Sequence, residues 1–508
     1  MQKLKLETAL LDSSSRVQPA FSYRDWLRGY ESQPQEYEYW IDEIEGEIPP
    51  ELFGTFFRNG PGLLDVNGQS LHHPFDGDGM ICAISMQNGR AFFRNRFVKT
   101  DGYLAEKKAG KILYRGVFGT KKRGGWLANC FDLKHKNLAN TNIIYWGGKL
   151  LALWEGGEPY SLDPHSLETL GIDHLDGVLK PGDAFAAHPR VEHHSNGNQV
   201  LVNFAVKPGL SSRITIYEFN RTGQLYKQHS HTIPGFAFLH DMAISPHYCI
   251  FFQNPVMFNP LPYLLGLRSA AQCLEFLPEQ PTQIILIPRS PVDSLYKGGA
   301  TDDIKIIQTD ACFVFHHANA WEEDHQVYID SICYDSFPGL DHKTNFRKTN
   351  FDLIPEPQLW RFKVNLPMET VEYQLLEKRC CEFPSLNPVK VGKPYRYVYL
   401  GTAEAPRGHA PLQGVLKIDL LTGERQMWNA GHRGFVGEPL FVPRPQGTIE
   451  DDGWLLTLMY DAVHHRSDFV ILDARDLTLE PIARLHLKHH VPYGLHGSFV
   501  PEWFGPQL

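Results

Sequence analysis

The chain has 508 residues, of which 42% are hydrophobic and 12% aromatic, and its 49 Lys and Arg stand against 58 Asp and Glu. The net charge of −9, with no block rich in Lys or Arg, argues against a nucleic-acid partner. This length allows either one large closed architecture or two ordinary domains.

The N-terminal region has no recognisable motif, so we treat 1–20 as a tail and 21–508 as a single domain. It lacks the apolar segment of a secretory signal, and no segment reaches the ~18 apolar residues of a membrane-spanning helix. The eight cysteines include no CxxC pair and lie mostly in apolar segments, which is typical of reduced thiols. These features together indicate a cytoplasmic protein.

The predicted elements are mostly strands. The best predicted helix comes first, in SYRDWLRGYES (22–32), and short β-type segments separated by Gly, Pro, Asn and Asp follow from about residue 50 to the end. The clearest are 142–153, 198–206, 213–223, 247–252, 282–288, 326–334, 358–364, 395–401, 414–423, 453–460 and 468–476. This pattern predicts an all-β barrel, sandwich or propeller. With ~40–50 residues per blade, a propeller would have about seven blades.

Four histidines stand in distinctive settings: His188 in AFAAHPR, His240 in FAFLHDM, His316 in FVFHHANAWEE and His496 in PYGLHGS. Each lies in or just after an apolar segment, beside a small, turn-forming or Pro residue, as expected at the inner end of a strand. The inner strands of a propeller meet around one axis, which would bring the four imidazoles to one metal ion. Imidazole suits iron, copper, nickel or zinc. The chain has no HExxH motif, so a zinc protease is not supported.

Several longer motifs are similar to those of the carotenoid oxygenase family. They are FRNGPG, HPFDGDGM, NTNIIYWGGKLLALWEGG, FHHANAWEE, CCEFP, GEPLFVPRP and VPYGLHGS. The similarity extends from about Phe21 to Trp503. It implies a seven-bladed β-propeller in which loops and short helices form a cap over an axial iron(II) ion. That ion would be held by the four histidines above, with His317 as a neighbour of the third.

The resemblance also implies three glutamates behind the histidines. Glu155 in LWEGG would accept a hydrogen bond from the second histidine, Glu382 in CCEFP from the third, and Glu438 in GEP from the fourth. Four neutral imidazoles leave the metal charge uncompensated, and such carboxylates fix the ring orientation and supply negative charge. The alternative, that Glu382 and Glu438 are surface acids, fits their apolar neighbours less well.

Two further motifs have less specific interpretations. Thr141 in ANTN corresponds to a threonine that projects toward an open coordination position in family members. A turn-forming Thr in an Asn-rich loop is an equal interpretation. Asp76 and Asp78 in HPFDGDGM belong to a tight-turn sequence with too few carboxylates for a calcium loop, so we expect a structural role there.

The segment PVMFNPLPYLLGL (255–267) is apolar, broken by prolines and too short to span a bilayer. Family members draw substrate from the membrane surface through an apolar patch, and the resemblance places such a patch here. The expected residues are Val256, Phe258, Leu261, Leu264, Leu265 and Leu267, with Leu274, Phe276 and Leu277 beside them. An ordinary buried loop is the alternative. A peripheral contact with a membrane is therefore expected of this cytoplasmic protein.

The resemblance implies an iron(II) dioxygenase that uses O2 to cleave one polyene double bond into two carbonyl products, without an organic cofactor. It is strongest to cyanobacterial members, which favours an apocarotenoid cut at the central 15,15' bond to give retinal. No protein acid or base is expected beyond the metal centre. The alternatives are off-centre cleavage of an intact carotenoid, cleavage of a stilbene, retinoid isomerisation without O2, and a propeller that binds a carotenoid without catalysis.

Overall fold

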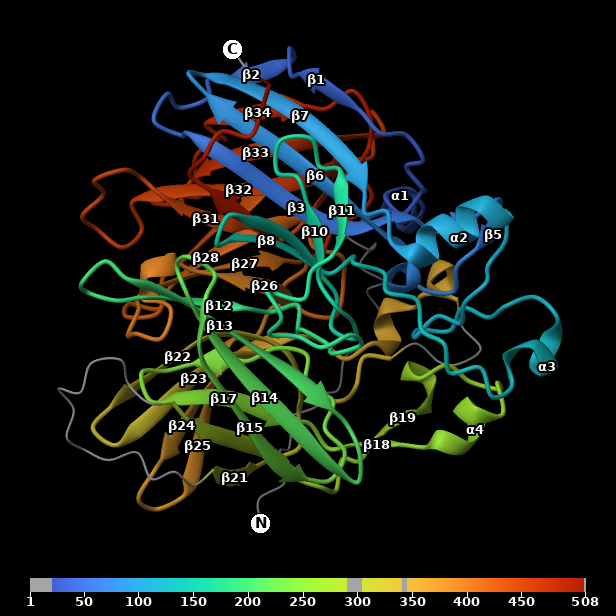
Figure 1. The fold of residues 1–508 in the computed structure, drawn as a ribbon. Coiled ribbons are helices and arrows are strands. Elements are labelled where there is room, and N and C mark those ends of the chain that lie inside the picture. The colour runs from blue at the N-terminus through green and yellow to red at the C-terminus, as the bar shows by residue number, and fades with distance from the viewer. Residues whose placement is uncertain (1–20, 290–303, 340–344, 507–508) are drawn as a thin grey trace, which may run out of the picture.

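The computed structural model describes residues 21–289, 304–339 and 345–506. The expected tail, 1–20, lies outside these residues. Seven antiparallel sheets arranged around one axis form a seven-bladed β-propeller, as the family resemblance implies (Figure 1). The axial strands of neighbouring blades contact one another, for example β35 with β8, β16 with β22 and β22 with β26.

The blades follow one another around the axis, and in each of them the strand order ends with the axial strand. The first contains β1 (Glu38–Trp40), β7 (Arg90–Phe97), β6 (Asp78–Gln87), β3 (Gly54–Leu63) and β35 (Gly497–Val500). The second contains β11 (Thr169–Ile172), β10 (Tyr160–Leu162), β9 (Lys149–Leu153) and β8 (Asn142–Trp146). The third contains β15 (Leu225–Pro234), β14 (Ser211–Asn220), β13 (Gln199–Lys207) and β12 (Arg190–His193).

The remaining four blades follow the same order. The fourth contains β21 (Lys305–Thr309), β20 (Thr282–Pro288), β17 (Tyr248–Gln253) and β16 (Ala243–Ile244). The fifth contains β25 (Thr370–Glu377), β24 (Gln358–Asn365), β23 (Gln326–Tyr334) and β22 (Phe313–Glu323). The sixth contains β29 (Arg425–Asn429), β28 (Gly414–Asp419), β27 (Tyr397–Thr402) and β26 (Cys381–Ser385). The seventh contains β2 (Ile44–Gly46), β34 (Ala483–His486), β33 (Arg466–Asp473) and β32 (Gly453–Asp461), and both β31 (Leu440–Pro443) and β30 (Gly434–Val436) pair with β32.

The elements outside the blades are short. The helices are α1 (Tyr23–Arg28), α2 (Asp101–Ala109), α3 (Gly125–Asn129) and α4 (Pro260–Leu264). The 3-10 turns are η1 (Pro74–Asp76), η2 (Ala271–Cys273), η3 (Phe346–Lys348), η4 (Phe351–Leu353) and η5 (Pro388–Lys390). Two two-stranded ribbons pair β4 (Asp65–Val66) with β5 (Gln69–Ser70) and β18 (Val256–Phe258) with β19 (Leu274–Phe276). The helices α2, α3 and α4 gather with β5, β18 and β19 on one side of the blades (Figure 1). Among the described residues, no helix is long and apolar enough to cross a membrane.

The hydrophobic core lies mainly between neighbouring blades. In one cluster Phe204 from the third blade packs with Phe251 and Ile285 from the fourth, all essentially inaccessible to solvent. The same two strands of the fourth blade turn their other faces toward the fifth. Because both faces of these strands are buried, many of their sequences are nearly continuous apolar runs and not strict alternations of apolar and polar residues. All eight cysteines are free thiols, as expected for a reducing environment.

The propeller is closed by pairing between an early strand and a late one, because β3 and β35 are neighbours in the first blade. In this register Arg58 lies opposite Gly497. The chain therefore joins the ends of the ring by backbone hydrogen bonds, and the residue before β35, His496, is drawn to the axis.

Gly497→Ala is expected to lower the stability of the closed ring. A methyl group on Gly497 would overlap the backbone carbonyl of Phe57 in β3, which cannot move without disturbing the sheet. Overpacking of this kind costs about 1–3 kcal/mol. Thermal unfolding of the variant should show a lower Tm. An unchanged Tm would mean that β35 pairs less closely with β3 than described.

Candidate metal centre

Four imidazole rings meet at the propeller axis. His188 lies two residues before β12, His240 three residues before β16, His316 within β22 and His496 directly before β35. One ligand nitrogen from each lies within 4.8 Å of those from the other three. The four sequence-predicted histidines therefore converge from four different blades.

The nitrogens are spaced as ligands of one ion would be. The Nε2 atoms of His188 and His240 are 3.0 Å apart, and those of His240 and His316 are 3.3 Å apart. Two ligands at right angles around an ion, each at about 2.1 Å, lie about 3 Å apart. The centre of the cluster is thus of the size that a first-row transition metal requires.

Each of three histidines has a carboxylate on its outer side. Nδ1 of His240 lies 2.5 Å from Glu155, Nδ1 of His316 lies 2.6 Å from Glu382, and the Nδ1 of the fourth histidine lies 2.9 Å from its own partner, Glu438. These are the three pairings that the family resemblance implies. A carboxylate only accepts, so each of these Nδ1 atoms carries a proton and the corresponding Nε2 is bare in the neutral ring.

The positions of these protons show whether the histidines could bind a metal ion. The bare Nε2 atoms of His240 and His316 face each other at 3.3 Å, and neither can donate to the other. Burial, reinforced by the neighbouring histidines, lowers the pKa of His188 well below its usual value, so this ring also stays neutral. Converging lone pairs on neutral rings with anionic groups behind them fit a divalent cation.

Glu382 is held from several sides. Besides His316, the Tyr334 hydroxyl donates to it at 2.7 Å and the Phe383 amide at 2.8 Å. Burial alone would raise the pKa of Glu382, but His316, Phe383 and Tyr334 together keep it below its usual value. The carboxylate is therefore ionised and fixed behind His316. Sequence reasoning did not single out Tyr334, which ends an ordinary apolar strand.

Glu438 is held by a cation. Arg58 in β3 donates to its carboxylate and to its backbone carbonyl, the latter at 2.8 Å, and the Gly497 amide donates at 3.1 Å. Burial would raise the pKa of Glu438, but Arg58 and His496 hold it below its usual range. Arg58 lies within FRNGPG, although its role could not be read from that motif.

Two β-bulges aim side chains at the axis. The pairing of β22 with β23 shifts between Val314 and His317, and that of β26 with β27 shifts between Glu382 and Ser385. Phe383 has a φ of 55°, which is uncommon for a bulky residue. Bulges of this kind re-aim side chains near functional sites. In this centre they turn His316 and Glu382 toward each other.

The comparisons with known proteins agree with this centre. Residues 30–501 match the family described as retinal pigment epithelial membrane protein. The chain belongs to this family, the carotenoid oxygenases. It is 53% identical to the apocarotenoid-15,15'-oxygenase of Synechocystis sp., over 96% of this chain and 98% of that protein. It is 30% identical to an isoeugenol monooxygenase of Pseudomonas nitroreducens, over 91% of this chain and 94% of that one.

The solved structures show the same propeller. The crystal structure of cobalt-substituted Synechocystis apocarotenoid oxygenase superposes with a TM-score of 0.91 at 53% identity. The superposition covers 95% of this chain and 99% of that one. That relative holds cobalt in place of its own metal.

In this carotenoid oxygenase, Thr141 contributes to the centre through its backbone. Its carbonyl accepts from the His496 amide at 3.0 Å, and its own amide donates to Leu153 at 3.1 Å. The buried hydroxyl donates to Asn140 at 3.2 Å. Thr141 therefore helps to position His496, and its expected role beside an open coordination position stays a prediction.

The expected apolar patch is only partly as predicted. Leu261 and Leu267 are 62% and 52% exposed, whereas Phe258, Leu264 and Leu265 are half-buried. The expectation was wrong for Val256, which pairs with Phe276 in the β18–β19 ribbon and packs into an apolar cluster. An apolar run in the sequence does not reveal which side chains of a two-stranded ribbon face the solvent and which face the core.

Helix α3 and the segment after it add further exposed apolar side chains that sequence reasoning missed. They are Trp126, Leu127, Phe131 and Leu133. The Phe131 amide donates to the Leu264 carbonyl at 2.8 Å, so this segment adjoins α4. Buried Arg115 donates to carbonyls on both sides, at Asn129 and Arg268, which holds the two segments together. We call Trp126, Leu127, Phe131, Leu133, Met257, Leu261 and Leu267 the α3–α4 patch.

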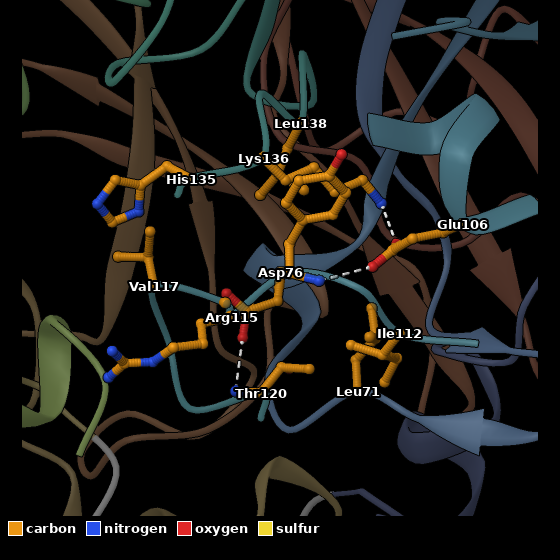
Figure 2. Close-up of a pocket in the computed structure, with 12 residues that line it drawn as sticks. Leu71, Asp76, Glu106, Ile112, Arg115, Val117, Thr120, His135, Lys136 and Leu138 are labelled. Carbon is orange, nitrogen blue, oxygen red and sulfur yellow. Dashed lines mark hydrogen bonds and ion pairs between the residues drawn. The ribbon is translucent and has the colours of Figure 1, made fainter. Parts of the chain in front are cut away.

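The motif HPFDGDGM is structural, as expected. The Asp76 carboxylate accepts from the backbone amide of Thr120 at 3.1 Å (Figure 2) and from that of Phe118 at 2.9 Å. Asp78 shares the Lys136 ammonium with Glu106, each at 2.6 Å. Asp76, Glu106 and Lys136 border a cavity of about 20 Å³, enough for a single water molecule. Both aspartates are thus occupied by donors of the protein itself.

Proposed function

We propose that this protein is an iron(II) dioxygenase that cleaves the central 15,15' double bond of an apocarotenoid with O2, giving retinal and a second carbonyl product. The observation that carries the proposal is the axial group of four histidines with a glutamate behind three of them. The 53% identity to a relative named for this reaction, along almost the whole chain, supports the substrate class.

His188, His240, His316 and His496 would hold the iron. Bound iron(II) would supply the activation of O2 and its addition across the double bond. The four ligands are neutral and leave coordination positions open on a six-coordinate ion. The glutamates keep the rings oriented, so the metal-binding geometry is built before substrate enters. No protein acid or base is required, because no proton has to be transferred to form the two carbonyl groups.

Aromatic side chains lie directly beside the centre. The Phe315 ring lies 5.2 Å from that of His240, and the Phe383 ring lies 5.4 Å from that of His496. These rings exclude water beside the metal and offer flat surfaces to a polyene.

Further phenylalanines extend from the centre toward β18. Phe315 contacts Phe313 at 4.7 Å between ring centres, Phe313 contacts Phe238 at 6.2 Å, and Phe236 stacks on Phe258 at 5.6 Å. Phe258 belongs to the ribbon next to α4. The surroundings of the centre on this side are therefore strongly apolar, which favours a polyene over a small polar phenol.

The test is an aerobic incubation of the iron(II)-loaded protein with a C30-range apocarotenal, followed by visible absorbance and product masses. Loss of the polyene band with retinal as product is the expected result. Two aldehydes of other lengths would place the cut at another bond. No reaction in a protein with one iron per chain would contradict the proposal and favour a stilbene-like substrate or a non-catalytic carotenoid binder. Reaction without O2 would indicate an isomerase.

We further propose that this cytoplasmic protein collects its substrate at a membrane surface through the α3–α4 patch. Leu127, Phe131 and Leu261 are each more than 60% exposed, and large apolar side chains gathered on one face mark an interaction site. Lys121 and Arg123 lie exposed just before α3 and suit anionic headgroups. Both helices are far too short to span a bilayer, so the contact would be peripheral.

Leu127→Glu combined with Leu261→Glu is expected to move the protein from the lipid fraction to the soluble fraction in liposome flotation. Each replacement removes exposed apolar area and adds a charge that the bilayer repels. Leu210→Glu, at a residue that is 99% exposed on the loop before β14, is the matched control and should change nothing. Wild-type protein that stays wholly soluble would count against the membrane contact.

A further inference from the structure

Arg58 is a buried cation directly behind the metal centre. It is 3% exposed, and it projects from β3, the strand that pairs with axial β35. Its guanidinium contacts the Glu438 carboxylate and donates to the carbonyls of Glu438 and Leu495 at 2.8 and 3.0 Å. A guanidinium stays protonated in proteins, so this positive charge is permanent.

The three glutamates differ in how their charge is compensated. Glu382 receives hydrogen bonds from a neutral phenol, that of Tyr334, and from a backbone amide. Glu155 is 31% exposed, so water screens it. Glu438 alone among the three pairs with an arginine among the described residues. Arg58 is therefore linked to the metal site through Glu438 and His496 and would act on a bound ion through them.

The charges of the centre balance for a divalent ion. Three carboxylates and one guanidinium leave the group of neutral histidines with a net charge of minus two. The nearby pair of Arg190 and Asp241, 2.5 Å apart, is neutral by itself. A divalent ion brings the total to zero, and a trivalent ion would leave a buried charge of plus one. Buried net charge is costly, since the surroundings screen it poorly.

We propose that Arg58 is a positioning residue that holds the bound iron in the ferrous state. The inference rests on the proposed iron site. Iron(II) passes one electron to an oxidant, O2 or an added mediator, when it becomes ferric, and no bond of the protein forms or breaks. The added positive charge is repelled by Arg58 through Glu438 and His496. Without the guanidinium, the carboxylates would favour the ferric ion.

The experiment is a redox titration of the iron-loaded protein with mediators, read by the ferric electron paramagnetic resonance signal. Arg58→Gln is expected to shift the ferrous–ferric equilibrium at least about tenfold toward ferric iron, which is about 59 mV for one electron. Arg58→Lys keeps the charge and should keep most of the wild-type potential. Arg361→Gln, which breaks a buried pair with Asp330 elsewhere in the fifth blade, should leave the potential unchanged.

Two additional variants keep the test decisive if Arg58→Gln does not fold. Glu438→Gln removes one negative charge and should shift the equilibrium about tenfold toward ferrous iron. The double variant Arg58→Gln/Glu438→Gln restores the net charge of the centre and should return the potential close to wild type. Equal potentials in all these variants would overturn the role of Arg58. A wild-type protein that binds no redox-active iron would instead overturn the proposed function itself.

Discussion

His316→Ala is expected to abolish metal binding and with it the oxygenase activity. His316 reaches the axis from a bulged strand, and its outer nitrogen is fixed by Glu382 at 2.6 Å, so the change removes a ligand that is already oriented toward the metal site. Changing a group that merely supports a ligand costs about 10–100-fold in metal affinity or activity, and losing the ligand itself should cost more. Iron content per purified chain and product formation are the measurements.

The neighbouring His317 provides a matched control. It is buried and faces the other way, with its Nδ1 2.7 Å from the Ser331 hydroxyl. Burial lowers the pKa of His317 to about 4, so it is neutral and structural at ordinary pH. His317→Ala should reduce stability while leaving iron stoichiometry near one. If His316→Ala retained iron, or if only His317→Ala lost it, then His317 and not His316 would be the metal ligand.

Glu438→Gln is expected to have the second-largest effect, because it damages both the metal centre and the fold. The change leaves Arg58 buried with no counter-charge, and breaking a buried ion pair from one side costs about 3–5 kcal/mol. The amide also presents N–H groups to His496, which itself donates from Nδ1. Metal affinity should fall about 10–100-fold. Urea unfolding of the metal-free protein and metal titration measure the two effects separately.

Glu155→Gln serves as the comparison. Its carboxylate is 31% exposed and lies behind His240, so its loss should cost little stability of the metal-free protein while still weakening metal binding. If Glu155→Gln and Glu438→Gln destabilised the metal-free protein equally, the buried pair with Arg58 would not be the source of the larger effect.

The all-β class followed from local signals, whereas the choice of a propeller needed the family resemblance. Turn residues between short apolar runs predict an all-β fold, and the helix expected at 22–32 is present as α1. The blades carry no sharp repeat, because their strands range from two residues in β16 to eleven in β22. Composition could therefore not separate a propeller from a sandwich or a barrel.

The residues nearest the axis could be named from sequence motifs. The residues that hydrogen-bond to them and hold them in place could not. The four histidines and three glutamates lie where the resemblance places them. Arg58 and Tyr334 sit on β3 and β23 and reach the centre across strand registers that no local pattern reveals. Val256 and Leu261 belong to one apolar run yet face opposite environments, because the ribbon geometry and not the composition decides exposure.

The pairing of β3 with β35 also orders the assembly of the centre in time. His496 directly precedes β35, the last strand in chain order, whereas the other three histidines come from strands made much earlier. A partly synthesised chain can contain the earlier blades yet still lacks His496, which is the partner of Glu438, and β35, the strand that closes the ring. The full set of four histidines and the closed ring are consequently complete only once the last strand has been made. An incomplete chain therefore offers a metal ion at most three of the four imidazoles.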